Sequence, residues 1–179
     1  QFITKLKDKL NCKLILVGDP NQNIYQFQGG SDKFLLEYQA KLYQLKRNYR
    51  STSNIVKFIN SISPHETKMI SNSRKKSDKI SIFQGTIDQI EKDILKELKN
   101  SKIDLSDIAI IGPVKRCNIK DGNYLNIGLS LIVNALSKNK INFIKHYTDT
   151  NNAKFDNNKI VTKENHVNLF TIHGCKGLE

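Results

Sequence analysis

Residues 13–30, KLILVGDPNQNIYQFQGG, join a short apolar run to a loop that is rich in amide and aromatic side chains. The apolar run, Lys13 to Val17, has the length of a buried strand. The loop after it carries Asp19, Gln22 and two aromatic rings between glycines. A connection that only reversed the chain would not need this chemistry, because glycine and one or two short polar residues suffice for a turn. The stretch therefore predicts a strand that ends at a ligand-binding loop, as in open α/β sheets.

Apolar runs of strand length alternate with longer helical patterns along the chain, which predicts an α/β fold with a parallel sheet and flanking crossover helices. Besides residues 13–18, strands are expected at residues 41–50, 80–83, 107–113, 141–147 and 166–174. Helices are expected at residues 31–39, 54–62, 86–100 and 128–140. The helix at 86–100 has the strongest signals, because Thr86 and Gln89 match a capping box and precede a stripe of isoleucine and leucine. Residues 148–165 are expected to form an exposed loop with a weak strand at NKIV.

The charge of the chain favours an anionic partner. Its 179 residues include 29 Lys and Arg against 17 Asp and Glu, a formal net charge of +12 at pH 7. Nucleic acid is the expected partner, and a solvated lysine-rich surface is the alternative. The three cysteines are far apart and odd in number, which predicts neither a disulfide framework nor a metal site and suits an intracellular, reducing compartment such as the cytoplasm, nucleus or a viral replication site. No segment has the length of a membrane span, so no membrane partner is expected.

Three polar clusters follow predicted strands: GDPNQNIYQFQGG, RNYRS and TIHGCKGLE, at residues 18–30, 47–51 and 171–179. Loops at the carboxyl ends of parallel strands face one crevice, so the three clusters are expected to converge on one ligand site. Each cluster alone also has a structural explanation. An Asp after a strand can be a cap, a Tyr-Arg pair a surface hinge, and a Lys-Gly pair a turn.

The residue patterns of the three clusters, and their order along the chain, resemble those of a known family. G-D-x-x-Q-x-I-Y-x-F-x-G, then N-Y-R-S, then T-x-H-x-x-K-G-L-E resemble motifs III, IV and V of superfamily 1 DNA helicases of the UvrD, Rep and PcrA type. The resemblance covers nearly the whole chain, from Gly18 to Glu179. It implies a RecA-like P-loop NTPase fold and an ATP-dependent enzyme that moves 3′ to 5′ along single-stranded DNA and unwinds duplex junctions. DNA replication and DNA repair are among the processes such a family implies.

Four residues of the first two clusters would act on the nucleotide if the resemblance holds. Gln22 resembles the amide that hydrogen-bonds the terminal phosphate of ATP and the attacking water, and Asp19 would brace the same loop. Tyr49 resembles the residue whose ring stacks on adenine; a half-buried ring at a hinge is the alternative. Arg50 resembles an arginine finger, a role that suits its permanently charged, bidentate side chain.

The rings of the opening stretch, Tyr25 and Phe27, resemble a platform on which unstacked bases lie. Such stacking gives roughly 1 to 3 kcal/mol per base and has little sequence preference. The short separation from Gln22 implies that a change at the terminal phosphate moves these rings. The family motif usually continues Y-x-W-R-G, whereas here Phe27 stands in place of Trp and Gln28 in place of Arg. The stacking face is therefore smaller and one charge is absent.

The last cluster combines expected contacts to both ligands. Thr171 and His173 resemble residues that contact DNA phosphates, and a packed histidine is the alternative for His173. Lys176 resembles the basic residue near the nucleotide phosphates, and Glu179 the carboxylate that accepts a hydrogen bond from the ribose hydroxyl.

The chain contains no G-x-x-x-x-G-K-[ST] loop and no D-E pair after an apolar strand. The ligands of Mg²⁺ and most of the ATP site are therefore expected outside these residues, in the rest of the helicase chain, and this fragment alone should be inactive. Residues 1–50 are expected to be the C-terminal part of a first RecA-like domain. Residues 51–179 would form a second one without a large accessory insertion. The alternative function is a non-catalytic, basic nucleic-acid-binding scaffold derived from a helicase.

Overall fold

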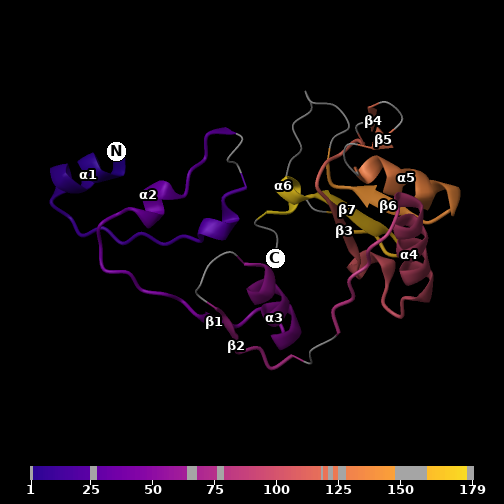
Figure 1. Cartoon of the computed structure of the whole chain (residues 1–179), viewed down its shortest axis with the longest axis horizontal. Helices are drawn as coiled ribbons and strands as arrows, with labels where there is room; N and C mark the ends of the chain where they lie inside the picture. Colours follow the sequence, from indigo (N-terminus) through magenta and orange to yellow (C-terminus); the bar gives the residue numbers. More distant parts are fainter. Residues whose placement is uncertain are drawn as a thin grey trace. The chain divides into compact units, whose positions relative to one another are not determined.

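The structure is a computed structural model that describes residues 2–24, 28–63, 68–75, 79–117, 119–120, 123–124, 128–147 and 161–176. The chain divides into two compact units, Gln1–Ser81 and Ile82–Glu179 (Figure 1). Both units contain helices and parallel strands, so the predicted α/β class is confirmed. The predicted boundary between two lobes at Arg50 lies inside the first compact unit.

The second unit is built on a three-stranded parallel sheet with the order β3-β7-β6. Its helices are α4 (Ile87–Asn100), α5 (Leu129–Lys138) and the short α6 (Ile172–Cys175). Its strands are β3 (Ala109–Gly112), β6 (Phe143–Lys145), β7 (Val167–Thr171) and the antiparallel pair β4 (Ile119–Lys120) and β5 (Asn123–Tyr124). A 3-10 turn, η3 (Leu105–Asp107), precedes β3. The predicted helices at 86–100 and 128–140 and the predicted strands at 107–113 and 141–147 are confirmed. The strand predicted at 166–174 forms only up to Thr171, because the hydroxyl of Thr171 caps the helical turn α6 that follows.

The capping box at the start of α4 forms as predicted. The backbone N–H of Gln89 donates to Oγ1 of Thr86 at 3.4 Å, and the backbone N–H of Thr86 donates to Oε1 of Gln89 at 3.2 Å. Two N–H groups that have no partner within the helix are thus satisfied by side chains. The helix therefore begins where the sequence predicts.

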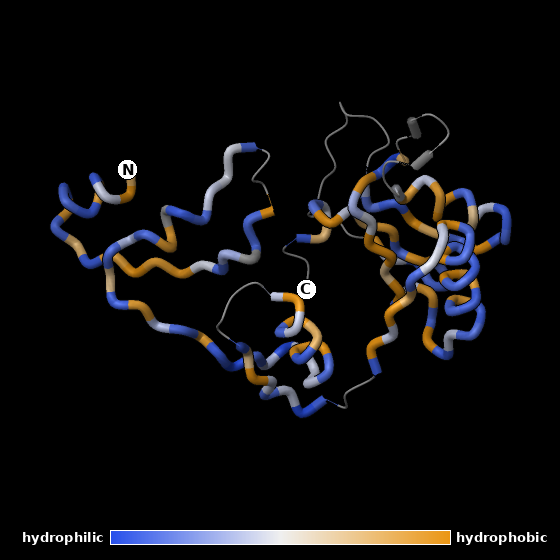
Figure 2. The backbone as a smooth tube through the Cα atoms, in the orientation of Figure 1, coloured by the Kyte–Doolittle hydropathy of each residue, from blue (hydrophilic) through white to orange (hydrophobic). Residues whose placement is uncertain are grey.

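The core of the second unit lies between the sheet and helices α4 and α5. Figure 2 shows apolar residues along the strands and alternation of apolar and polar residues around both helices. Leu169 of the central strand and Leu136 of α5 are completely buried. The other buried members of this cluster are Leu98, Leu129, Ile132, Tyr147 and Val167. Burial of several large side chains in one cluster makes this unit the better-packed part of the chain.

A polar group is buried on the opposite face of the same sheet. Successive strand residues point to opposite faces, so Asn168 and Phe170 point away from Leu169. Nε2 of His146 lies 2.9 Å from Oδ1 of Asn168, and Nδ2 of Asn168 donates to the carbonyl of Ser106 at 2.7 Å. The His146 ring stacks on Phe170 with ring centroids 4.3 Å apart. No sequence pattern predicts this arrangement, which makes His146 a packing residue with a satisfied ring nitrogen.

The first unit has shorter elements: α1 (Phe2–Leu10), η1 (Pro20–Gln22), α2 (Lys33–Leu36), β1 (Arg47–Asn48), α3 (Ser53–Ile62) and β2 (Ile70–Ser71). Strands β1 and β2 pair in parallel, with Arg47 opposite Ile70 and Asn48 opposite Ser71. The predicted helix at 54–62 is confirmed, and its buried face centres on Val56, which is 2% exposed.

Of the predictions for the first unit and its C-terminal border, two are wrong and two hold over only part of their length. Residues 13–18 form no strand, and Ile15 and Val17 are 85% and 83% exposed. The strand expected at 41–50 is limited to β1, and residues 80–83 form no strand. The helix expected at 31–39 is limited to α2, and its N-cap is Asp32. A strand needs a neighbour for its backbone groups, and within the described part of the chain these apolar runs have none. The weak strand expected at NKIV falls mostly outside the described residues.

Asp104 gives the second unit a carboxylate that accepts hydrogen bonds from Ser106 and Asn165. Hydrogen bonds from the side chain and the backbone N–H of Ser106, and from the backbone N–H of Asn165, lower the pKa of Asp104. The stability that this carboxylate contributes is therefore present above its unfolded value of about 3.9 and is lost as pH falls through the lower folded pKa.

We expect the stability advantage of the natural protein over Asp104→Asn to shrink between pH 5 and pH 3, since asparagine keeps an acceptor oxygen but does not titrate. Thermal unfolding of both proteins at the two pH values measures this difference. An advantage of the same size at both values would show that the charge of Asp104 has no part in folding.

Candidate functional site

The second polar cluster forms a tight turn at the end of β1. Oδ1 of Asn48 accepts hydrogen bonds from the backbone N–H groups of Arg50, at 3.1 Å, and Ser51, at 2.8 Å. An asparagine whose side chain bonds the backbone two residues on is an Asx turn. Tyr49, within this turn, is 65% exposed, and Arg50 is exposed as well. The turn therefore exposes an aromatic residue and an arginine at consecutive positions.

The turn is also held from strand β2. The backbone N–H of Asn72 donates to the carbonyl of Asn48 at 2.7 Å, and the hydroxyl of Ser71 donates to the carbonyl of Ser51 at 2.9 Å. Helix α3 starts at Ser53, directly after the turn. The first N–H groups of a helix carry a partial positive charge, so the local field adds to that of Arg50 and favours an anion.

Strand β2 is attached to α3 by one asparagine. Nδ2 of Asn60 donates to the carbonyl of Met69 at 2.8 Å, and Oδ1 of Asn60 accepts from the N–H of Met69 at 2.9 Å. The amide side chain thus makes the same pair of bonds that a neighbouring strand would make. Neither bond involves the turn that carries Arg50.

The opening cluster forms a compact loop at η1. Nε2 of Gln22 donates to Oδ2 of Asp19 at 3.2 Å, and the N–H of Gln22 donates to the carbonyl of Asp19 at 3.0 Å. Both side chains are exposed. Gly29, with φ of 84°, makes the turn that follows. Tyr25 and Phe27 lie outside the described residues.

The last cluster begins with a capped helical turn after β7. The hydroxyl of Thr171 accepts a hydrogen bond from the N–H of Gly174 at 3.1 Å, and Thr171 is 9% exposed. A Cβ atom at Gly174 would lie 3.0 Å from that hydroxyl, so the position favours glycine. His173 and Lys176 are exposed. Glu179 lies outside the described residues.

The structure thus brings predicted site residues together within each cluster. Asp19 bonds Gln22, and Tyr49 and Arg50 share one turn, all in the first unit. Thr171, His173 and Lys176 follow one strand of the second unit. Sequence reasoning missed Asn48, although an Asn at the end of a strand and before two exposed polar residues is itself an Asx-turn signal.

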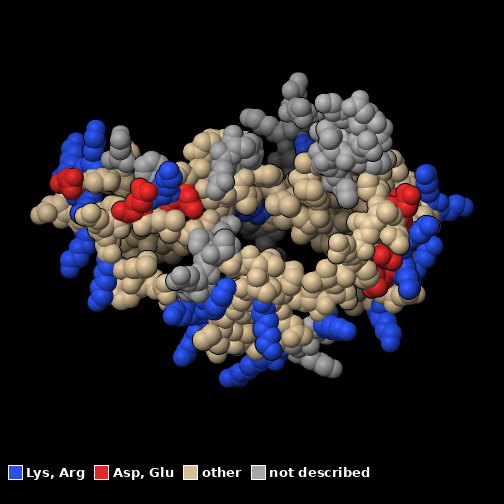
Figure 3. Space-filling model, viewed as in Figure 1, with Lys and Arg blue, Asp and Glu red and all other residues tan. Residues whose placement is uncertain are grey.

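Positive charge is concentrated around the Arg50 turn. Residues 41–75 contain a single acidic residue, Glu66, and eight basic ones: Lys41, Lys46, Arg47, Arg50, Lys57, Lys68, Arg74 and Lys75. Figure 3 shows lysine and arginine side chains over the part of the first unit that holds β1, β2 and α3. Among the residues that the structure describes, no three His, Cys, Asp or Glu side chains gather so as to hold a metal ion. This surface is suited to anions.

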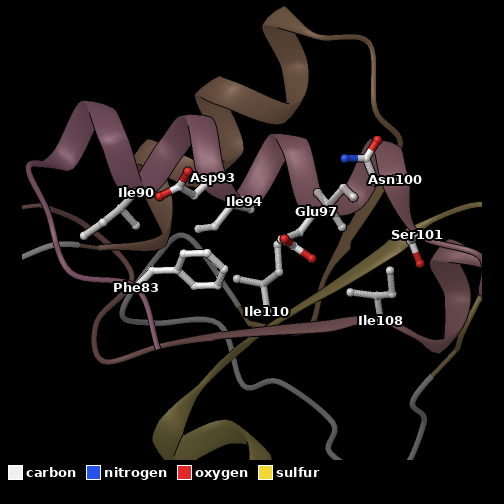
Figure 4. A pocket seen from close by; sticks show the side chains of 10 residues that line it. Phe83, Ile90, Asp93, Ile94, Glu97, Asn100, Ser101, Ile108 and Ile110 are labelled. Atoms are coloured by element: carbon white, nitrogen blue, oxygen red, sulfur yellow. The ribbon is translucent and has the colours of Figure 1, made fainter. Parts of the chain in front are cut away.

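A separate cavity of about 350 Å³ lies in the second unit between α4 and β3 (Figure 4). Its walls are mainly apolar, with Phe83, Ile94 and Ile110 opposite one another, and the carboxylates of Asp93 and Glu97 lie at its rim. No predicted site residue lines it. Two carboxylates and an apolar wall do not suit a phosphate group, so this cavity is not part of the candidate site.

Comparison with known proteins identifies the class. A protein of Acanthamoeba polyphaga mimivirus, provisionally named an ATP-dependent DNA helicase, is 39% identical over 97% of this chain. The ATP-dependent DNA helicase PcrA of Staphylococcus epidermidis is 30% identical over 55% of the chain. The ATP-dependent DNA helicase UvrD2 of Mycobacterium bovis is 43% identical over 27% of the chain. No protein-family model and no solved structure match the chain.

These similarities define a helicase-type chain. It belongs to the superfamily 1 DNA helicases of the UvrD, Rep and PcrA type and carries the segment with motifs III to V. The chain spans 25% of the length of the mimivirus relative, 15% of PcrA and 8% of UvrD2. None of the helices in the described ranges is long and apolar enough to cross a membrane.

Proposed function

We propose that this chain is part of an ATP-dependent DNA helicase or translocase that couples ATP hydrolysis to 3′-to-5′ movement along single-stranded DNA and unwinds duplex DNA. Residues 1–50 would belong to a first RecA-like lobe and residues 51–179 to a second. The observation that carries the proposal is the turn of Asn48, which presents Tyr49 and Arg50 together before the first N–H groups of α3. A ring can stack on a base, and a guanidinium group and a helix N-terminus both suit phosphate, so the turn can hold part of an adenine nucleotide.

On the nucleotide side, Arg50 would contact the terminal phosphate and Tyr49 would stack on adenine. Gln22, held by Asp19, would orient the attacking water. Lys176 would lie near the phosphates and Glu179 would accept a hydrogen bond from the ribose. Mg²⁺ would be held by residues outside this chain, so the fragment alone would not hydrolyse ATP.

On the DNA side, Tyr25 and Phe27 would stack on unpaired bases, and Thr171 and His173 would contact backbone phosphates. The hydroxyl of Thr171 already accepts from Gly174, but it keeps its own hydrogen for a phosphate oxygen. The basic side chains between residues 41 and 75 support the same partner, because cations replace the counterions of a polyanion. The free thiols of Cys12, Cys117 and Cys175 support an intracellular, reducing compartment for the protein.

The proposal is tested with the full-length protein that contains these residues. We expect its ATPase activity to rise when single-stranded DNA is added, and a duplex with a 3′ single-stranded tail to be unwound in preference to one with a 5′ tail. Single-stranded RNA serves as the alternative track. DNA binding without any ATP hydrolysis would instead identify a non-catalytic scaffold.

A second test concerns the aromatic platform. Tyr25→Ala combined with Phe27→Ala should weaken binding of single-stranded DNA by about 2 to 5 kcal/mol at fixed salt, because two stacking faces are lost. Fluorescence anisotropy with a labelled oligonucleotide measures this affinity over a series of salt concentrations. Loss of affinity with an unchanged salt slope supports stacking. A change in the salt slope alone would assign the binding to lysine and arginine contacts with phosphates.

A further inference from the structure

We propose that Asn48 is a positioning residue for Arg50. Its side-chain oxygen would hold the turn so that the guanidinium group reaches the terminal phosphate in the transition state. This inference rests on the proposed role of Arg50 as an arginine finger. It assigns to Asn48 a role that acts through Arg50, without contact between Asn48 and the nucleotide.

The hydrogen bonds of the turn carry the inference. A single atom, Oδ1 of Asn48, accepts from the N–H groups of Arg50 and of Ser51. These two bonds determine the direction of the peptide groups on both sides of the Arg50 Cα atom. Removal of the amide leaves both N–H groups without this acceptor. Water can then bond these N–H groups in several backbone conformations, so the backbone at Arg50 is less restricted.

The amide of Asn48 is itself held in place. The residue is half-buried, and its Nδ2 lies 3.8 Å from Sδ of Met69. The backbone of Asn48 is part of β1, whose carbonyl accepts from Asn72. An acceptor that is attached to a paired strand and is half-buried against Met69 has restricted freedom, so it can hold the exposed turn in the orientation of the strand.

The direction of the backbone at Arg50 matters because the guanidinium group lies at the end of a long side chain. A small rotation at the Cα atom therefore becomes a larger displacement of the guanidinium group. A displacement of about 1 Å of a catalytic group can cost on the order of 100-fold in rate. An arginine finger stabilises charge in the transition state, so its misplacement lowers kcat with little effect on KM. Loss of folding stability, in contrast, lowers the amount of active protein without changing the kcat of the molecules that remain folded.

Two substitutions and one matched control separate these cases in the full-length protein. Asn48→Ala should lower the kcat of DNA-stimulated ATP hydrolysis roughly 10- to 100-fold, with KM for ATP within about threefold. Asn48→Ser should recover most of the loss, because a serine hydroxyl can accept from the same backbone N–H groups in an ST turn. Asn60→Ala is the control. It also removes an amide with two bonds to the backbone of one residue, Met69. The Sδ of Met69 lies 3.8 Å from Nδ2 of Asn48, whereas Oδ1 of Asn48 accepts the two bonds of the turn, so kcat should stay within about threefold.

A binding measurement gives a readout without turnover. ADP with aluminium fluoride imitates the transition state at the terminal phosphate, whereas ADP lacks that group. Asn48→Ala should weaken binding of ADP with aluminium fluoride about tenfold or more and leave binding of ADP unchanged. The double variant Asn48→Ala with Arg50→Ala should be no slower than Arg50→Ala alone, because a residue that acts only through Arg50 has nothing left to position.

The outcomes distinguish this inference from the proposed function. If Arg50→Ala leaves hydrolysis unchanged, the finger role itself is wrong. If Arg50→Ala abolishes hydrolysis while Asn48→Ala and Asn60→Ala behave alike, the finger role stands and the positioning role of Asn48 is overturned. The same conclusion follows if Asn48→Ser is as slow as Asn48→Ala in properly folded protein.

Discussion

Replacement of Arg50 with alanine is expected to lower DNA-stimulated ATP hydrolysis by the full-length protein about a thousand-fold or more. The side chain is exposed on a turn whose backbone is held at Asn48 and Ser51, before the first N–H groups of α3. A guanidinium group there can give two parallel hydrogen bonds to phosphate oxygens as negative charge develops. Steady-state turnover at saturating ATP and DNA measures the loss. DNA affinity should remain within a few-fold, since one of eight basic residues in the range 41–75 is removed.

Two companion variants show whether the effect belongs to the position or to charge in general. Arg74→Ala removes another exposed arginine of the first unit and should leave turnover within about twofold of the natural protein. Arg50→Lys keeps the charge but loses the planar fork, so we expect it to recover only a small part of the lost rate. Equal losses for Arg50→Ala and Arg74→Ala would assign the effect to the overall field, and unchanged hydrolysis in Arg50→Ala would refute the finger role.

The sequence predicts the second unit well because its signals are local and its core is completed within the chain. The capping box at Thr86 and Gln89 and the apolar stripe behind it specify α4 without any distant partner. Strands β3, β6 and β7 are recognised because each is an apolar run that finds a partner strand: β7 pairs with both of the others, and β3 and β6 each pair with β7. Local and long-range preferences agree here, and the predicted elements form.

The first unit shows the limit of the same reasoning. The run at residues 13–18 has the composition of a strand, yet Ile15 and Val17 are exposed. The composition of a segment shows only that its residues favour a pleated, half-buried surface. A strand forms only when a second strand pairs with it, and composition does not identify that second strand. The same holds for residues 80–83. A helix makes its backbone hydrogen bonds within itself and needs no such partner. The prediction of α3 was therefore correct.

The candidate site was predictable as a set of side chains and not as a set of contacts. The motifs identify Gln22, Arg50 and Thr171 by residue type and spacing. The brace of Gln22 by Asp19 was expected from the motif, whereas the bonds that orient the Arg50 backbone come from the amide of Asn48, which has a weaker signal. Short polar side chains can bond the backbone in several local patterns, and only the fold selects one of them.

Leu169→Ala is expected to lower the stability of the second unit by about 3 kcal/mol, within the usual range of roughly 2 to 5 kcal/mol for such a cavity. Leu169 is completely buried in the central strand β7, where it packs in the cluster that contains Leu129 and Leu136. Strands β3 and β6 pair with β7 on its two sides, so relaxation around the cavity is restricted. Hydrogen exchange of the full-length protein, followed by mass spectrometry of peptides from α4, α5 and β7, measures the change. Exchange through opening of this unit should accelerate roughly 100-fold.

The consequence should extend to the candidate site, because Thr171 lies two residues after Leu169 on the same strand and starts the turn that leads to His173 and Lys176. We therefore expect DNA-stimulated ATP hydrolysis of Leu169→Ala to fall at a lower temperature than that of the natural protein, together with the loss of exchange protection. Leu42→Ala is the matched control, since Leu42 is 81% exposed and its truncation leaves no cavity. Unchanged exchange in β7 would mean that this strand is not the centre of the core. If exchange protection is lost but activity is retained at every temperature, the turn after β7 has no part in ATP hydrolysis.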